Sequence, residues 1–127
     1  MLSKCTLNAC VRLWIDLVIF SFLIQEVIQN VSLGCPKRYS NYEIHEAPVT
    51  SKYGVRCCSY NGKSCVSGPC KTITTYAKAF EICEKREMRL CYENEIDTCC
   101  GSGCTLDPKY VWLLDNTAGI EYLNNRR

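Results

Sequence analysis

Cysteine is the residue that most constrains how this chain can fold. Ten of its twelve cysteines lie after residue 34, at a density above the about 8–10 % that marks a disulfide scaffold. An even number of cysteines behind an apolar leader indicates cross-linking rather than catalysis or metal binding. Ten cysteines can pair in about 945 ways, so the sequence leaves the pairing open. The cysteines predicted to form disulfides are Cys35, Cys57, Cys58, Cys65, Cys70, Cys83, Cys91, Cys99, Cys100 and Cys104.

Residues 1–34 are typical of a secretory signal peptide. Lys4 and Arg12 give a positively charged start, and the apolar run 17–24 follows. A membrane-spanning helix needs about 20 apolar residues, so this run is short, and Asp16 would be costly at membrane depth. The leader therefore favours export over membrane insertion.

The predicted cleavage point follows the segment Ser32-Leu33-Gly34, which offers small residues at both recognition positions. Cleavage before Cys35 would also remove Cys5 and Cys10 and leave an even ten cysteines. The alternative is an uncleaved signal anchor, which would give the protein a membrane as a partner. We expect a secreted, extracellular protein.

Charge and size limit the function classes. The whole chain has a formal net charge of +2, and its charges are mixed along the sequence rather than grouped. Such a pattern has no basic patch for a nucleic acid or an anionic membrane. A domain of this size buries a thin core, and disulfides worth about 2–4 kcal/mol each would supply the missing stability.

One helix is predicted over residues 75–87. Tyr76, Ala79, Phe80 and Cys83 lie at helical spacing and form one stripe, with charged residues on the other side. A capping threonine precedes the stripe. This helix is the principal one that the sequence indicates.

The remaining pattern predicts an α+β fold, with the helix packed on a short antiparallel sheet. The extended segments of that sheet are 53–60, 88–91 and 110–114. Cys57 and Cys58 are adjacent in a predicted strand, so they should point to opposite sides and bond different parts of the fold. The predicted core residues are Phe80, Leu90 and Trp112. The predicted domains are an irregular N-terminal segment 35–52 held by one disulfide from Cys35, a disulfide-rich domain 53–115, and a tail 116–127.

Four segments follow one another in an order shared with a known family. They are the helix 75–83, Met88-Arg89-Leu90-Cys91, the acidic turn 93–96, and Val111-Trp112-Leu113. In this order, residues 55–114 resemble a shortened, cysteine-rich C-type lectin-like domain. The resemblance implies that family's scaffold and extracellular recognition. Members that bind sugar through calcium carry Glu-Pro-Asn or Gln-Pro-Asp and a later Trp-Asn-Asp, and none of these triplets occurs here. The resemblance therefore implies no calcium-dependent sugar site.

Three kinds of chemistry can be weighed from residue types. Glu93, Glu95 and Asp97 alternate along a short segment, but calcium needs about six to eight oxygen ligands, so we interpret them as a solvated acidic turn. Zinc favours closely spaced thiolates, yet the chain has no Cys-x-x-Cys pair and oxidised cysteines are expected after export. The only histidine, His45, has no predicted free thiol to activate. We therefore expect no enzyme, no metal and no other cofactor.

Exposed tyrosines are the remaining functional clue. Tyr60 and Tyr92 flank cross-linked loops, and tyrosine is favoured in recognition surfaces because it offers a large contact area with few rotatable bonds. We interpret the chain as a secreted, non-enzymatic recognition module that binds a protein or glycan surface through disulfide-stapled loops, which lose little entropy on binding. The alternatives are a small cysteine-rich toxin or effector acting on a channel or membrane target, and a hydrolase inhibitor that presents the loop 65–70.

Overall fold

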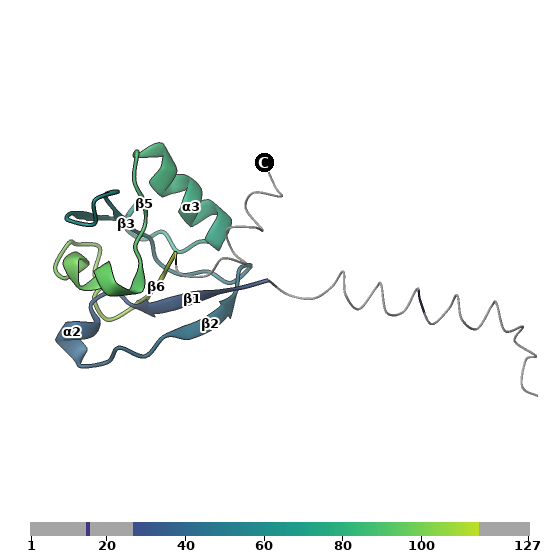
Figure 1. The fold of residues 1–127 in the computed structure, drawn as a ribbon, viewed down its shortest axis with the longest axis horizontal. Helices are drawn as coiled ribbons and strands as arrows, with labels where there is room; N and C mark the ends of the chain where they lie inside the picture. Colours follow the sequence, from purple (N-terminus) through teal and green to yellow (C-terminus); the bar gives the residue numbers. More distant parts are fainter. Residues whose placement is uncertain (1–14, 16–26, 115–127) are drawn as a thin grey trace, which may run out of the picture.

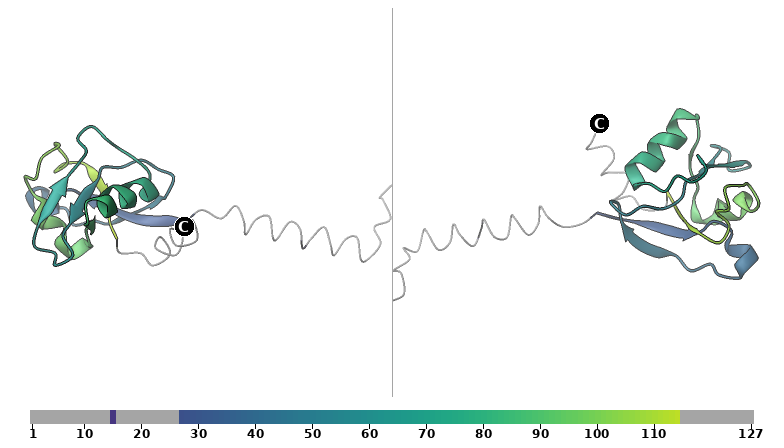
Figure 2. Two further views of the ribbon diagram at one scale, coloured as in Figure 1. Left: turned by 90° about the horizontal axis from the view of Figure 1, so that it is seen from above. Right: turned by 180° about the vertical axis from the view of Figure 1, so that it is seen from behind.

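The structure is a computed structural model, and it describes residue 15 and residues 27–114. Helix α3 (Tyr76–Lys85) lies on the opposite side of the domain from strands β1 (Ile28–Leu33) and β2 (His45–Pro48), as Figure 1 and the further views in Figure 2 show. The predicted tail 116–127 and most of the predicted signal peptide lie outside the described residues. In chain order the elements are β1 (Ile28–Leu33), α2 (Pro36–Tyr39), β2 (His45–Pro48), β3 (Arg56–Cys58), β4 (Cys65–Ser67), α3 (Tyr76–Lys85), β5 (Arg89–Leu90), the 3₁₀ helix η1 (Glu93–Cys99) and β6 (Tyr110–Trp112).

The structure confirms the α+β class and the main helix, but it contains two sheets where one was predicted. One three-stranded antiparallel sheet has the order β2-β1-β6, and the other has the order β4-β3-β5. Strand β6 pairs with β1, a segment that the sequence assigned to the leader. Two backbone hydrogen bonds link β6 to Gly54, two residues before β3: Gly54 N donates to Tyr110 O, and Trp112 N donates to Gly54 O.

Strand β1 changes the N-terminal boundary of the folded unit. It is the central strand of its sheet, with Val31 opposite His45 on one side and Trp112 on the other. Val31 and Leu33 are buried. The folded unit therefore begins by residue 27, and the boundary predicted between residues 34 and 35 would cut the domain. The segment 35–52 is also more regular than predicted, since it contains α2 and β2.

All ten cysteines predicted to be cross-linked are paired. Cys57 bonds Cys83 of α3, while Cys58 bonds Cys91 after β5, so the two neighbours do reach different parts of the fold. Cys35 holds its segment through one bond, as expected. Within the described part of the chain no cysteine is free. The remaining bonds are Cys35–Cys100, Cys65–Cys99 and Cys70–Cys104.

Trp112 is the centre of the larger apolar core. It is fully buried, and its ring meets Tyr53 and Tyr76 edge-on at centroid distances of 5.1 Å and 5.5 Å. The indole Nε1 donates to Thr74 O at 2.8 Å, which satisfies its one polar atom. Leu90 is also fully buried, whereas Phe80 is only partly buried and packs against the rim of this core.

Arg56 is a fully buried cation that ties distant segments together. Its Nη1 donates to Gly34 O, its Nη2 donates to Asp107 Oδ1 at 2.7 Å, and its Nε donates to Ser67 Oγ at 2.9 Å. The Gly101 N–H also donates to the Asp107 carboxylate. Burial alone would raise the pKa of Asp107, but the hydrogen bonds from Arg56 and Gly101 and the charge of Arg56 together lower it. Asp107 is therefore held as a carboxylate.

None of the helices that the structure describes is long and apolar enough to cross a lipid bilayer.

Candidate functional site

The 3₁₀ helix η1 presents the most prominent candidate surface. Tyr92 immediately precedes it, and the Tyr92 N–H donates to Glu95 Oε1 at 2.8 Å while the Glu95 N–H donates to Tyr92 O. Ile96 and Cys99 are buried and anchor the inner side of η1. The outer side of η1 is therefore displayed from a fixed base.

An ion pair holds the start of η1. Arg89 donates to both carboxylate oxygens of Glu95 at 2.7 Å, and its guanidinium lies 4.5 Å from the centre of the Tyr92 ring. Hydrogen bonds from Arg89 lower the pKa of Glu95, against the opposing effect of burial, and the Tyr92 N–H lowers it further. Arg89 also donates to Tyr60 O at 3.3 Å. One arginine thus connects both tyrosines that the sequence singled out.

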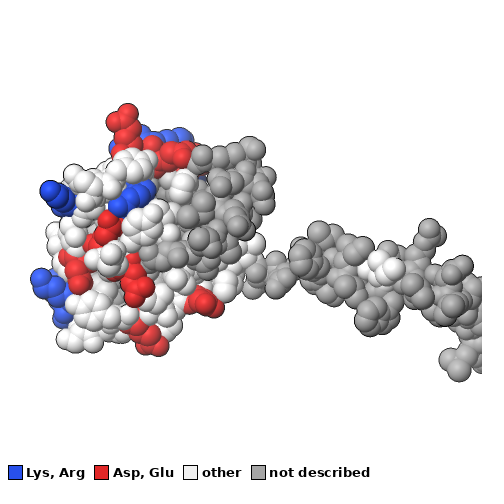
Figure 3. All heavy atoms as spheres, in the orientation of Figure 1, with Lys and Arg blue, Asp and Glu red and all other residues white. Residues whose placement is uncertain are grey.

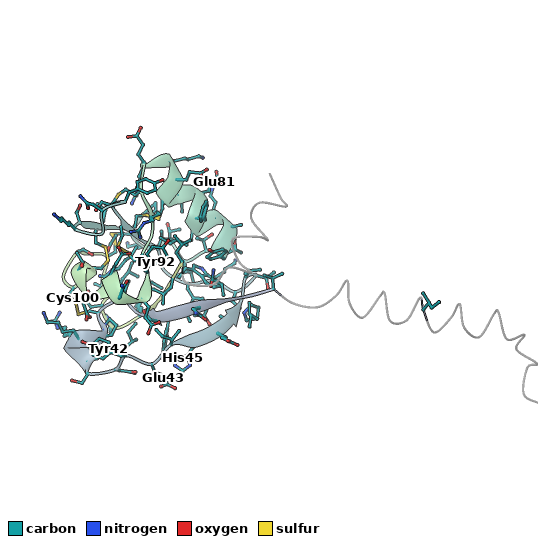
Figure 4. The ribbon with its side chains drawn as sticks, viewed as in Figure 1. Tyr42, Glu43, His45, Glu81, Tyr92 and Cys100 are labelled. Atoms are coloured by element: carbon teal, nitrogen blue, oxygen red, sulfur yellow. A yellow bond between two sulfur atoms is a disulfide. The ribbon has the colours of Figure 1, made fainter. Side chains whose placement is uncertain are left out.

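Disulfides fix η1 at both ends. Cys58–Cys91 closes the chain just before it, Cys65–Cys99 holds its last residue, and Cys35–Cys100 holds the residue after it. Cys100 and Tyr92 are labelled in Figure 4, at the two ends of this short segment. A segment held in this way loses little conformational entropy when it binds.

Three exposed tyrosines surround this segment, and we call them the tyrosine surface: Tyr42, Tyr60 and Tyr92. Their exposed fractions are 59 %, 67 % and 39 %. The sequence pointed to Tyr60 and Tyr92 as a binding surface but not to Tyr42. Tyr42 lies just after α2 and is fifty residues before Tyr92 in the sequence. The two tyrosines come together because α2 docks beside η1. No signal in the local sequence indicates that contact.

A shallow depression of about 550 Å³ lies between Tyr42 and Tyr92. Asp97 Oδ1 accepts the Lys37 N–H at 3.0 Å. Slight burial, a hydrogen bond to Asp97 and the charge of Asp97 all raise the pKa of Tyr42. Asp and Glu spheres gather on the part of the face in Figure 3 that lies over η1 in Figure 1. The residues that line the depression are Tyr42, Tyr92, Glu93, Asn94 and Asp97.

The three acidic residues considered for calcium do not form one site. Glu95 is engaged by both amino groups of the Arg89 guanidinium, while Glu93 and Asp97 line the depression. Two carboxylates are too few for the six to eight oxygen ligands that calcium takes.

His45 lies on β2 (Figure 4). Its Nε2 is 3.7 Å from Glu43 Oε2, and its ring centre is 5.2 Å from that of Tyr110.

Four sulfur atoms lie close together below the tyrosine surface. The Sγ atoms of Cys58, Cys65, Cys91 and Cys99 are all within 4.8 Å of one another. They belong to two disulfides, and Cys91 Sγ of one bond lies 3.5 Å from Cys99 Sγ of the other. A metal ion needs thiolates, which disulfide sulfurs do not provide. In this pairing the four sulfurs are cross-links.

Replacing Cys65 with alanine is expected to yield two disulfide isomers. The released Cys99 sulfur lies 3.5 Å from Cys91, and a thiolate attacks a disulfide sulfur directly. Attack forms Cys91–Cys99 and releases Cys58 as a thiol. Peptide mapping by mass spectrometry, after free thiols are blocked without reduction, measures both isomers. Replacing Cys70 with alanine is the matched control, because its partner Cys104 lies outside the four-sulfur group and a single isomer is expected. A homogeneous Cys65→Ala product that keeps Cys58–Cys91 would contradict this prediction.

Replacing Glu95 with glutamine is expected to loosen the start of η1. The variant loses the carboxylate charge to which Arg89 donates two hydrogen bonds. Charge-assisted hydrogen bonds are stronger than those between neutral groups. We expect amide hydrogen exchange at Glu95 and Ile96 to speed up about tenfold or more. The exposed Glu46, replaced in the same way, should leave amide exchange at η1 unchanged. Because the pKa of Glu95 is lowered in the folded protein, the stability that its ion pair contributes is complete above about pH 4.3 and is lost as the pH falls further. Unchanged exchange in the variant would show that the ion pair does not hold η1.

Comparison with known proteins finds no matching family model, no matching curated protein and no matching solved structure.

Proposed function

We propose that this protein is an exported, non-enzymatic recognition module that binds a protein through the tyrosine surface. The observation that carries the proposal is the support beneath Tyr92. Three disulfides and the bidentate Arg89–Glu95 pair hold the segment that presents it. Exposed aromatic side chains on a rigid base are typical of recognition surfaces.

Export is supported by the leader and by cysteine pairing. Disulfides persist in oxidising compartments and are rare in the cytosol, and five bonds join the ten cysteines after residue 34. Because β1 is the central strand of its sheet, we place signal cleavage before Val27 instead of before Cys35.

The sequence resemblance to C-type lectin-like domains remains a prediction, and it is compatible with a recognition role. A toxin or effector acting on a membrane target would be favoured by a basic face. Here the overall charge is nearly balanced and acidic groups gather near η1. A hydrolase inhibitor would use the loop around β4, where Val66 is exposed. The rigidly held tyrosine surface favours recognition through η1 over both alternatives.

The test is a binding screen with the full oxidised protein, recovered from a secretory host. Immobilised protein is exposed to purified extracellular proteins, and to purified glycans with and without calcium. We expect saturable binding to a protein partner, and the triple variant Tyr42→Ser, Tyr60→Ser, Tyr92→Ser should lose it. Tyr39→Ser is the matched control, because Tyr39 is also exposed but lies on α2 outside the tyrosine surface.

Circular dichroism and the disulfide map must be unchanged in the triple variant for its loss of binding to count. Partner binding that survives in the folded triple variant would reject the proposal. Calcium-dependent glycan binding without any protein partner would also reject it and would favour a lectin.

A further inference from the structure

The depression between Tyr42 and Tyr92 has a distinctive chemical lining. It combines two phenol rings, the carboxylates of Glu93 and Asp97 and one carboxamide, and no lysine or arginine lines it. Aromatic faces and carboxylates both attract cations. The lining therefore selects for positive charge on whatever enters.

Asp97 is the residue of the lining that most favours a positively charged ligand. Its carboxylate accepts a backbone N–H from Lys37, but it forms no salt bridge with any residue in the described part of the chain. The other two partly or fully buried carboxylates nearby behave differently, because Glu95 pairs with Arg89 and Asp107 pairs with Arg56. Within residues 27–114, therefore, no cation forms an ion pair with the Asp97 carboxylate.

The tyrosines suit the same ligand. The Arg89 guanidinium already lies 4.5 Å from the Tyr92 ring centre and occupies that face, so the attraction for a ligand cation comes from the rest of the lining. The Tyr42 hydroxyl forms a hydrogen bond with Asp97, and Tyr42 lines the same depression. Cations bound between aromatic rings and carboxylates gain from both kinds of interaction.

We infer that this depression receives a lysine or arginine side chain of the protein partner. The inference rests on the proposed function, and it names the chemistry that the tyrosine surface recognises. A bare metal ion fits less well, because two carboxylates and one carboxamide supply too few oxygens for calcium. A volume of about 550 Å³ accommodates a long side chain with a charged end.

The test is a titration of the oxidised, isotope-labelled full chain, followed by ¹H–¹⁵N NMR. The probes are N-acetyl-lysine methylamide and N-acetyl-arginine methylamide, and N-acetyl-norleucine methylamide is the uncharged control. We expect saturable shifts, in the millimolar range for so small a probe, confined to the amides of Tyr42, Tyr92, Glu93, Asn94 and Asp97. The norleucine probe should give no saturable shift there.

Asp97→Asn is the decisive variant, because asparagine keeps an oxygen to accept the Lys37 N–H but removes the charge. We expect its affinity for the charged probes to fall about fivefold or more. Glu46→Gln, an exposed change on β2, should leave the affinity unaltered. Equal binding of the norleucine probe, shifts located elsewhere, or an unchanged affinity in Asp97→Asn would each overturn the inference.

Failure of this inference is distinct from failure of the proposed function. A protein partner that needs the three tyrosines but binds Asp97→Asn normally would reject the cation site and keep the recognition role. Saturable binding of the lysine probe at the depression, with a protein partner that ignores the tyrosine variants, would reject the recognition role and keep the cation site.

Discussion

Replacing Asp107 with alanine is expected to lower the free energy of unfolding by about 3–5 kcal/mol, because it leaves a fully buried arginine without its counter-charge. The variant also removes the acceptor of the Gly101 N–H. A loss of this size is a large fraction of the 5–15 kcal/mol that stabilises a typical domain. Urea unfolding of the oxidised protein, followed by circular dichroism, measures it.

Two comparisons separate this explanation from simple loss of packing. Arg38 also contacts Asp107, but its side chain is 66 % exposed, so Arg38→Ala should cost about 1 kcal/mol or less. The double variant Arg56→Met, Asp107→Ala should lose less stability than the sum of its single variants, since the two residues form one network. Additive losses would contradict the proposed unpaired charge.

The same carboxylate gives a pH dependence with a definite sign. The pKa of Asp107 is lowered in the folded protein, so its stabilising effect is complete above about pH 4 and is lost as the pH falls further. We expect the stability of the parent protein to fall more steeply below pH 4 than that of Asp107→Ala. Equal slopes would show that the folded protein does not hold this carboxylate in its charged form.

A chain that begins at Cys35 is expected not to fold, whereas a chain that begins at Val27 is expected to fold. The shorter chain lacks β1, so β2 and β6 lose the strand between them and the buried Val31 and Leu33 are missing. Each such apolar side chain contributes about 1.5–3 kcal/mol by burial, before the lost backbone hydrogen bonds are counted.

Oxidative refolding in a glutathione buffer distinguishes the two chains. The chain from Val27 should give one dominant species with five disulfides on reversed-phase chromatography, and the chain from Cys35 should give a mixture of scrambled forms. A single native-like species from the shorter chain would show that β1 is dispensable and would restore the cleavage point before Cys35.

Local patterns in the sequence were sufficient where a single element decides the outcome. The helical spacing of Tyr76, Ala79 and Cys83 predicted α3, and all three are buried against the core. The alternation of side chains along a strand predicted that Cys57 and Cys58 would bond different partners, which they do. Both inferences need only the geometry of one element.

Inference from sequence failed where distant segments meet. Strand β1 was missed because it closely follows the leader-like apolar run 17–24, and the small residues Ser32 and Gly34 match a cleavage signal. The partner of Arg56 lies 51 residues further along the chain, so no local pattern indicates it. A charged residue within an otherwise apolar strand was the one available signal of a buried ion pair.

In the candidate site, too, local patterns predicted some residues and long-range contacts determined the others. Tyr60 and Tyr92 could be singled out because they flank cross-linked loops, and both are exposed. Tyr42 enters the site because α2 docks beside η1, where the Cys35–Cys100 bond and the Lys37 N–H to Asp97 hold the two segments together. Among about 945 pairings of ten cysteines, the sequence offers no means to choose that bond.

A disulfide map of the protein found in the medium is a direct test of both export and the disulfide-held fold. The chain is expressed with its own leader in a secretory host, and the product in the medium is digested without reduction and analysed by mass spectrometry. We predict an N-terminus at or before Val27, no free thiol after residue 34, and five bonds: Cys35–Cys100, Cys57–Cys83, Cys58–Cys91, Cys65–Cys99 and Cys70–Cys104. A protein that stays in the cytosol with reduced cysteines and yet folds compactly would contradict the account.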